Sequence, residues 1–368
     1  MILRKRCEGL AFFWGFIIAL FVSVASIPII IKVAIKFGFV DEPNHRKVHS
    51  KAMPRIGGLA IIFGTISALL YLKPSSPYLL EIAIGAAILI TIGLIDDRYP
   101  LSARVKLFGQ LLSAIIVVSS GLTIDYMNIP FFGDVQFGIW SYPISIGWIL
   151  IMINSINLID GLDGLAGGVS TIATSTILLM ALMSPGAHFT IIAFSIAIIG
   201  STLGFLIFNF HPAKIFMGDT GSLFLGYGIA IISMLGFFKS VTIFSLIIPI
   251  LILGVPILDT SFAIVRRFLN KQKISDADKG HLHHCLLNMG FDHRKTVFII
   301  YGMSLAFSGA AIMFSRSTLW VSILSLFILM AVVQVFAECI GLIGKRRKPL
   351  INAFKRLSTV AQVYKRTE

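Results

Sequence analysis

Long apolar segments separated by polar loops dominate this chain of 368 residues. A transmembrane α-helix needs roughly 20 predominantly apolar residues, and many of the segments approach that length. Backbone groups in hydrocarbon must be hydrogen-bonded within the structure, which favours helices for runs of this length. The pattern predicts an all-α polytopic membrane protein with about eleven transmembrane helices, at residues 10–31, 57–72, 79–95, 105–122, 143–157, 166–183, 189–208, 221–238, 242–265, 297–315 and 319–343.

The main polar loops follow the first, third, fifth, seventh and ninth apolar segments. Odd-numbered segments end on the same side of a membrane, so these loops should share one face. Of the 31 lysines and arginines, 25 lie in the loops, at their edges or in the C-terminal tail. By the positive-inside rule this face is cytoplasmic. The loops are 37–56, 96–104, 157–165, 209–220 and 266–295.

The expected organisation is an integral membrane domain over residues 1–343 and a basic cytoplasmic tail over residues 344–368. Arg4-Lys5-Arg6 opposes this orientation, because it would lie outside. A model with ten segments would bring the N-terminus inside but would divide the polar loops between two faces. On the opposite face, residues 123–142 contain Pro130 and Gly133 and should form an extended or hairpin-like loop.

The composition agrees with a membrane protein and shows that the chain is strongly basic. The chain is 57% hydrophobic and 13% charged, whereas about a quarter of the residues of a soluble domain are charged. The formal net charge is +14. Positive charge gathered on one face would attract nucleotides and anionic lipids.

The loop after the fifth segment carries an unusual run of polar residues. Asn154, Asn157, Asp160 and Asp163 recur every three residues. On an α-helix each such step falls about 60° short of a full turn, so neighbours would lie on nearly one face. Carboxylates beside a membrane are costly and usually functional. Nearby glycines let a ligand approach the backbone, so a metal ion, a phosphate or a nucleotide could bind here.

Two adjacent carboxylates, Asp96 and Asp97, close the third segment. They could bind a divalent cation or act as a base. The alternative is a solvated helix terminus, although negative charge at a C-terminus opposes the helix dipole. Lys106, at the start of the next segment, could hold a phosphate or anchor the helix at the interface.

Asp219 lies between Gly218 and Gly221 at the start of the eighth segment. Backbone amides at a helix N-terminus favour an anion, so Asp219 would need a cation in order to share the site with a phosphate. The alternative role for Asp219 is a helix cap.

Three histidines, His281, His283 and His284, stand in the longest of the polar loops. Imidazoles can donate to phosphate oxygens. A zinc site with Cys285 and a plain solvated loop are the alternatives, but no other zinc-type ligands are close in sequence. Asp259, within the ninth segment, is a candidate buried carboxylate with a structural or functional partner.

Taken together, these motifs resemble the polyprenyl-phosphate N-acetylhexosamine-1-phosphate transferase superfamily, also called glycosyltransferase family 4. The resemblance runs from about Asp41 to Arg294. It implies ten or eleven helices and a cytoplasmic, magnesium-dependent site that transfers a sugar 1-phosphate from a UDP-sugar to a polyprenyl phosphate and releases UMP. The motifs, in order, are Pro54-Arg-Ile-Gly-Gly58, Asp96-Asp97, Asn154 to Asp163, Phe216-Met-Gly-Asp-Thr-Gly-Ser222 and His281-Leu-His-His284.

Within the superfamily, Arg46-Lys-Val-His49, Pro54-Arg55 and the histidine motif resemble bacterial undecaprenyl-phosphate GlcNAc-1-phosphate transferases. The resemblance implies transfer of GlcNAc-1-phosphate from UDP-GlcNAc to undecaprenyl phosphate, the first membrane step of a cell-envelope glycan such as teichoic acid or lipopolysaccharide. The alternative is a phospho-N-acetylmuramoyl-pentapeptide transferase. Those enzymes usually carry a lysine three positions after the aspartate pair, where this chain has Pro100.

The resemblance also implies roles for individual residues. Asp219 is the first choice for the magnesium ligand, with Asn157 beside it and manganese as an alternative ion. Asp96 and Asp97 would orient or deprotonate the lipid phosphate, with Lys106 near it. The remaining positions would line the nucleotide, metal or substrate side (Asn154, Asn157, Asp160, Asp163), contact uridine (Asn209, Phe216) or hold the pyrophosphate (His281, His283, His284).

The expected partners are a UDP-sugar, a polyprenyl phosphate and the bilayer of a bacterial inner membrane, with no nucleic acid. A homodimer is left open. Direct attack by the lipid phosphate is the preferred mechanism over an aspartyl-phosphate intermediate. The rival class is an ion-coupled transporter, whose polar groups would lie near the bilayer midplane. Here they stand at segment ends on one face.

Overall fold

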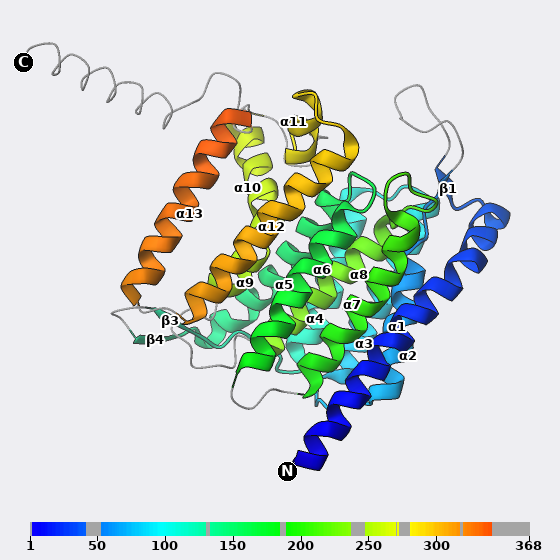
Figure 1. Ribbon diagram of the computed structural model, residues 1–368, viewed down its shortest axis with the longest axis horizontal. Coiled ribbons are helices and arrows are strands. Elements are labelled where there is room, and N and C mark those ends of the chain that lie inside the picture. Colours follow the sequence, from blue (N-terminus) through cyan, green and yellow to red (C-terminus); the bar gives the residue numbers. More distant parts are fainter. Residues whose placement is uncertain are drawn as a thin grey trace, which may run out of the picture.

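Helices make up nearly all of the ordered architecture in the computed structural model of the chain (Figure 1). The structure describes residues 2–41, 53–129, 133–184, 189–236, 247–269, 271, 280–316 and 319–340. The basic tail at 344–368 and the motif Arg46-Lys-Val-His49 lie outside the described residues.

Each predicted apolar segment contains a helix in the described part of the chain, and the ninth contains two. The helices are α1 (Ile2–Phe37), α2 (Gly58–Leu72), α3 (Leu79–Arg98), α4 (Ala103–Ser119), α5 (Ser141–Ile159), α6 (Leu165–Met183), α7 (Phe189–Asn209), α8 (Gly218–Gly236), α9 (Ile247–Ile252), α10 (Gly254–Leu269), α12 (His293–Arg316) and α13 (Leu319–Ile340). A short helix, α11 (Leu282–Asn288), lies in the loop before α12.

The prediction of an all-α, multi-pass membrane protein is confirmed, but the number of spans is not. Among the described residues, seven helices are long and apolar enough to cross a membrane, and α2 is a shorter apolar helix. In the ninth segment α9 and α10 meet at Leu253. Pro256 lies in the first turn of α10, where its missing N–H is not needed. The expected total of eleven is therefore not established.

The centre of the bundle is α8, which packs against α2, α3, α5, α6 and α7. Its residues are buried continuously from Thr220 to Met234, as expected for a helix that is apolar on all sides. Two glycines allow this close packing at its N-terminal end. A Cβ at Gly58 of α2 would lie 2.2 Å from the backbone of Gly221, and one at Gly93 of α3 would lie 2.5 Å from Cα of Thr220.

The two ends of the bundle differ. The strand β1 (Val40–Asp41), which pairs with β2 (Met53–Pro54), lies at the same end as α11, at the top of Figure 1. The opposite end carries the antiparallel hairpin of β3 (Tyr126–Ile129) and β4 (Gly133–Gln136). The hairpin-like connection predicted within 123–142 is thus confirmed, and the polar loops gather at the other end.

Candidate active site

A lysine joins three helices at the centre of the polar end. Nζ of Lys106, in the first turn of α4, lies 2.8 Å from Oδ2 of Asp96 and 2.7 Å from Oδ2 of Asp219. Asp96 lies in the last turn of α3, and its other oxygen accepts the N–H of Leu101 at 2.7 Å. Asp219 begins α8. Residues predicted from separate loops therefore form one chain of ion pairs.

Asp97 has a different task from its neighbour Asp96. Its oxygens accept the N–H of Asp219 at 2.8 Å, the N–H of Thr220 at 3.1 Å and the hydroxyl of Thr220 at 2.6 Å. These amides belong to the first turn of α8, where no partner exists within the helix. Asp97 is therefore the cap of α8 from a neighbouring helix, and it positions Asp219. That it deprotonates the lipid phosphate stays a prediction.

Gly218 makes this arrangement sterically accessible. Its φ is +71°, and a Cβ at this position would lie 1.9 Å from the carbonyl oxygen of Arg55 and 2.6 Å from Oδ1 of Asp97. Only glycine combines that backbone conformation with such close neighbours. The next segment back, at Phe216, pairs with the loop before α2: its N–H donates to Pro54 O at 2.8 Å and its carbonyl accepts from Gly57 at 2.9 Å. Two motifs of the sequence thus lie side by side.

The run from Asn154 to Asp163 does not form one helical face, contrary to expectation. The helix α5 ends at Ile159, and Asp160 is its C-cap. Asp163 lies in the turn that follows, just before Gly164 with its φ of +79°, and is therefore not on a face of α5. Asn154 donates to Gln110 of α4 at 2.8 Å, and Asn157 donates to Ser222 of α8 at 2.8 Å. The side chains therefore serve different neighbours.

Asp160 lies among other carboxylates. Burial raises its pKa to about 8, and the negative charges of Asp219, Asp97 and Asp163 add to the rise, against the opposing charge of Arg55. Burial is the larger cause of this raised pKa, and the charge of the neighbouring carboxylates is the smaller one. Hard oxygen ligands with surplus negative charge suit Mg²⁺. That Asp219, with Asn157 beside it, holds such an ion stays a prediction.

Asn209 holds two loops together. Its Oδ1 accepts the N–H of Gly164 at 2.9 Å and its Nδ2 donates to Ile215 O at 2.9 Å, and the residue is buried. Tyr301 of α12 supports the same turn, because its hydroxyl donates to Gly164 O at 2.5 Å. Sequence reasoning did not find Tyr301, since a tyrosine in an apolar helix has no distinguishing pattern. Contact of Asn209, Phe216 or Asn154 with substrate stays a prediction.

A second acid and imidazole cluster surrounds Asp163. Its Oδ2 accepts from His211 Nδ1 at 2.8 Å and from the N–H of Ala213 at 3.2 Å. The ring of His211 stacks on that of His293, with centroids 4.2 Å apart and planes 18° apart. Ligand atoms of the three residues lie within 4.8 Å of one another. Nitrogen lone pairs lie in the ring planes, however, so two stacked rings do not converge on one ion. We interpret the cluster as support for Asp163.

Neither His211 nor His293 was among the predicted site residues. His211 could have been predicted, because it follows the candidate residue Asn209 in the same loop. His293 begins a helix far along the chain, and only the packing of α12 against α6 brings it here.

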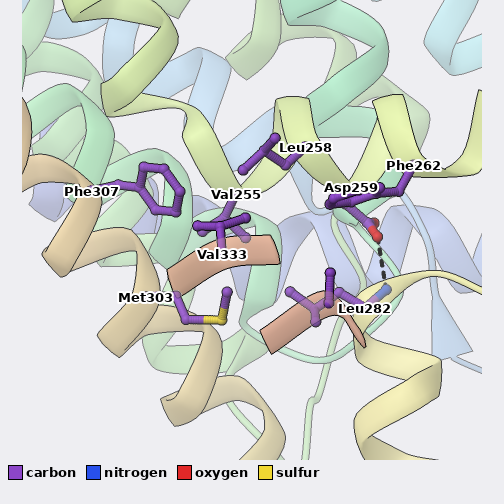
Figure 2. A pocket seen from close by; sticks show the side chains of 9 residues that line it. Val255, Leu258, Asp259, Phe262, Leu282, Met303, Phe307 and Val333 are labelled. Atoms are coloured by element: carbon purple, nitrogen blue, oxygen red, sulfur yellow. Dashed lines mark hydrogen bonds between the residues drawn. The ribbon is translucent and has the colours of Figure 1, made fainter. Parts of the chain in front are cut away.

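The histidine motif is held by a carboxylate within the bundle. Asp259 of α10 accepts the N–H of Leu282 at 2.8 Å, the bond drawn as a dashed line in Figure 2. Its other oxygen lies 2.9 Å from Nδ1 of His281. A carboxylate only accepts, so Nδ1 carries the proton and donates. Asp259 therefore has a structural role, because it caps α11 and orients His281.

His283 meets the Asp160–Asp163 turn. A Cβ at Gly161 would lie 2.5 Å from its Nε2, so this glycine lets the imidazole contact the backbone. Burial lowers the pKa of His283 to about 4, and nearby His284 adds to the effect. The ring is therefore neutral at pH 7 and interacts through its N–H rather than through charge. Within the described residues, the metal-type cluster around Asp163 includes neither Cys285 nor this motif, so the zinc alternative has no support.

An apolar pocket lies beside the histidine motif, and Asp259 is its one charged lining residue (Figure 2). Helices α10, α11, α12 and α13 contribute its walls. Because Asp259 is engaged with α11, the pocket presents mainly hydrocarbon. Its lining is Val255, Leu258, Asp259, Phe262, Leu282, Met303, Phe307, Val333 and Ala337.

Comparisons with known proteins place the motifs in a wider set. Residues 79–237 match the model of glycosyl transferase family 4, a range that contains Asp96, Lys106 and Asp219 but ends before Asp259 and the histidine motif. Over 348 residues the chain is 50% identical to a probable undecaprenyl-phosphate N-acetylglucosaminyl 1-phosphate transferase of Bacillus subtilis, covering 93% of this chain and 96% of that protein.

More distant relatives preserve less of the chain. A decaprenyl-phosphate N-acetylglucosaminephosphotransferase of Mycolicibacterium smegmatis is 34% identical over 298 residues, 73% of each chain. A phospho-N-acetylmuramoyl-pentapeptide-transferase of Chlorobium phaeobacteroides is 34% identical over 233 residues, 52% of this chain and 60% of that protein.

Proposed function

Because this chain belongs to the polyprenyl-phosphate N-acetylhexosamine-1-phosphate transferase family, we propose that it transfers GlcNAc-1-phosphate from UDP-GlcNAc to undecaprenyl phosphate. The products are undecaprenyl-diphospho-GlcNAc and UMP. The observation that carries this proposal is the joint site of Asp96, Lys106 and Asp219 at the capped start of α8. One cation lies between two carboxylates there, and the proposal assigns this site to the phosphoryl group.

The chemical problem is repulsion between two anionic phosphates. Phosphoryl transfer is catalysed mainly by positioning and by neutralising charge on the oxygens. A magnesium ion held by Asp219, Asp160 and Asn157, with manganese as an alternative, would neutralise the pyrophosphate of the UDP-sugar. Asp97 would keep Asp219 in place through the amides of α8.

Direct attack by the lipid phosphate needs no covalent enzyme intermediate. An oxygen of the acceptor phosphate forms a bond to the sugar-linked phosphorus, and the bond from that phosphorus to the bridging oxygen breaks. The bridging oxygen leaves with UMP. In this proposal Lys106 holds the acceptor phosphate, and the neutral His283 donates to the pyrophosphate. Phosphate is already ionised at pH 7, so Asp96 is needed for orientation more than for proton removal.

The site would face the cytoplasm. This orientation rests on the concentration of lysine and arginine at the polar end. The apolar pocket beside Asp259 offers hydrocarbon surface next to the histidine motif, as a lipid substrate requires. Nothing at the opposite end, in the described part of the chain, gathers carboxylates in the same way.

The test is a substrate panel. Purified protein in detergent is incubated with undecaprenyl phosphate, magnesium and one of UDP-GlcNAc, UDP-GalNAc or UDP-MurNAc-pentapeptide, and UMP and the lipid product are measured. UMP release with UDP-GlcNAc is expected, together with a lipid carrying one sugar and two phosphates. Release only with UDP-MurNAc-pentapeptide would assign the protein to the other branch. No release with any of the three would contradict the proposed activity.

A further inference from the structure

Lys106 satisfies two carboxylates at once. Its ammonium lies 2.8 Å from Asp96 and 2.7 Å from Asp219, and its side chain is 25% exposed against 7% and 16% for the two acids. A lysine that served only to bind an incoming phosphate would not need to reach across from α4 to the start of α8. By pairing with Asp219, Lys106 therefore offsets the negative charge of that carboxylate.

Asp219 has a single carboxylate, and Lys106 pairs with one of its oxygens, Oδ2. The other acid at this helix end, Asp97, is directed at the backbone amides and at Thr220. A divalent cation on Asp219 would lie within a few ångströms of the lysine ammonium. Like charges at that distance in a partly buried site repel strongly. Metal and lysine cannot both pair closely with Asp219 without a cost.

We propose that Lys106 is a built-in counter-ion of Asp219 that a divalent cation displaces. The lysine then keeps its bond to Asp96 and turns its remaining donors to the acceptor phosphate. Binding of the metal and availability of the lysine are thereby coupled, because two ligands that compete for one group weaken each other reciprocally. The inference rests on the proposed function in taking Asp219 as the metal ligand, but it makes a claim about metal affinity that needs no substrate.

The experiment is a titration of the full-length protein in detergent with Mn²⁺, followed by the electron paramagnetic resonance signal of the free ion, with no substrate present. Wild type is compared with Lys106→Met and with Arg104→Met. Arg104 is an exposed cation two residues earlier on the same helix, so its removal changes the net charge equally. Asp219→Asn reports how much of the binding belongs to Asp219.

The counter-ion role predicts that Lys106→Met binds Mn²⁺ about three- to tenfold more tightly than wild type, the scale of a partly exposed ion pair. Arg104→Met should change the affinity less than about twofold, because exposed charges are screened. Unchanged or weaker binding by Lys106→Met, or an equal gain in Arg104→Met, would overturn the counter-ion role. Wild-type affinity in Asp219→Asn would instead overturn the metal assignment in the proposed function.

A second comparison guards against a Lys106→Met protein that fails to fold. Asp96→Asn removes the other anchor of the lysine, so Lys106 pairs with Asp219 alone and Mn²⁺ binding should weaken. The same change in a Lys106→Gln background should have a smaller effect. Equal weakening in both backgrounds would mean that Asp96 acts only through its own charge, and the displacement would be wrong.

Discussion

Two helices at the polar end begin in the same way and differ in charge. The first amides of α8 are accepted by Asp97 of α3, and the first amide of α11 is accepted by Asp259 of α10. In both cases a carboxylate from a neighbouring helix caps a helix at this end of the bundle. Beside the α8 cap stand Lys106 and further carboxylates, whereas beside the α11 cap stands the neutral imidazole of His283. One structural device thus supports a region of ion pairs at α8 and a region of imidazoles at α11.

The comparison is tested most severely at the start of α8. Asp219→Ala removes the proposed metal ligand, and transfer should fall about a thousandfold or more because charge neutralisation is lost. UMP release and Mn²⁺ titration measure the two effects. Asp125→Ala is the matched control, since Asp125 bonds to Thr123 near the opposite end. Full activity in Asp219→Ala would remove the basis for calling this region the metal side.

Substituting each capping acid in turn, Asp97 and then Asp259, tests whether the start of α8 and the start of α11 act independently. Asp97→Asn leaves a single acceptor oxygen for the donors of Asp219 and Thr220, which use both oxygens of Asp97. Asp219 should therefore be displaced, and transfer should fall about ten- to a hundredfold. Mn²⁺ affinity should fall with it. Asp259→Asn should lower activity while Mn²⁺ affinity stays near that of wild type. Equal losses of Mn²⁺ affinity in both variants would show that the two regions are one electrostatic unit.

The region of imidazoles at α11 is tested by pH. The folded-state pKa of His283, about 4, is below the unfolded value of 6.5, so the unfolded chain binds more protons between these values. Its contribution to stability is complete above pH 6.5 and is lost as the pH falls toward 4. His283→Gln, which has no such titration, should lose less thermal stability than wild type between pH 6.5 and 4.5. Parallel melting curves for the two proteins across that range would contradict a neutral, buried imidazole.

The turn between the two regions should show the smallest effect. Tyr301→Phe removes one hydrogen bond to Gly164 and should cost about 0.5–1.5 kcal/mol. If that cost falls on the position of Asp160 and Asp163, kcat/KM for UDP-GlcNAc drops about three- to tenfold while Mn²⁺ affinity changes little. An unchanged kcat/KM would make Tyr301 a packing residue only.

Much of the site could be predicted because its residues stand at the ends of apolar segments. Asp96, Asp97, Asp160, Asp163 and Asp219 were identified in this way, and the structure brings them to one end of the bundle. Their individual partners could not be predicted. Asp97 and Thr220 are 123 residues apart, and Lys106 and Asp219 are 113 apart. Adjacent Asp96 and Asp97 look equivalent in a sequence and have different partners in the structure.

The run of four polar residues shows why a local rule failed. The three-residue spacing predicted one helical face, but α5 ends at Ile159, and Gly161 and Gly164 lie in the turn that follows. The glycines were visible, yet their effect depends on Asn209 and Tyr301, which hold the turn from α7 and α12.

The sequence by itself determined that the protein is helical and spans a membrane, because hydropathy acts over about twenty neighbouring residues. It also determined the end of the bundle at which the polar loops meet, since alternate segments end on the same side. Only the tertiary structure decided that Asp97 and Asp259 cap helices and that Lys106 neutralises Asp219. Those roles depend on how closely α3, α4, α8 and α10 approach their neighbours, which is set by packing between residues distant in the chain.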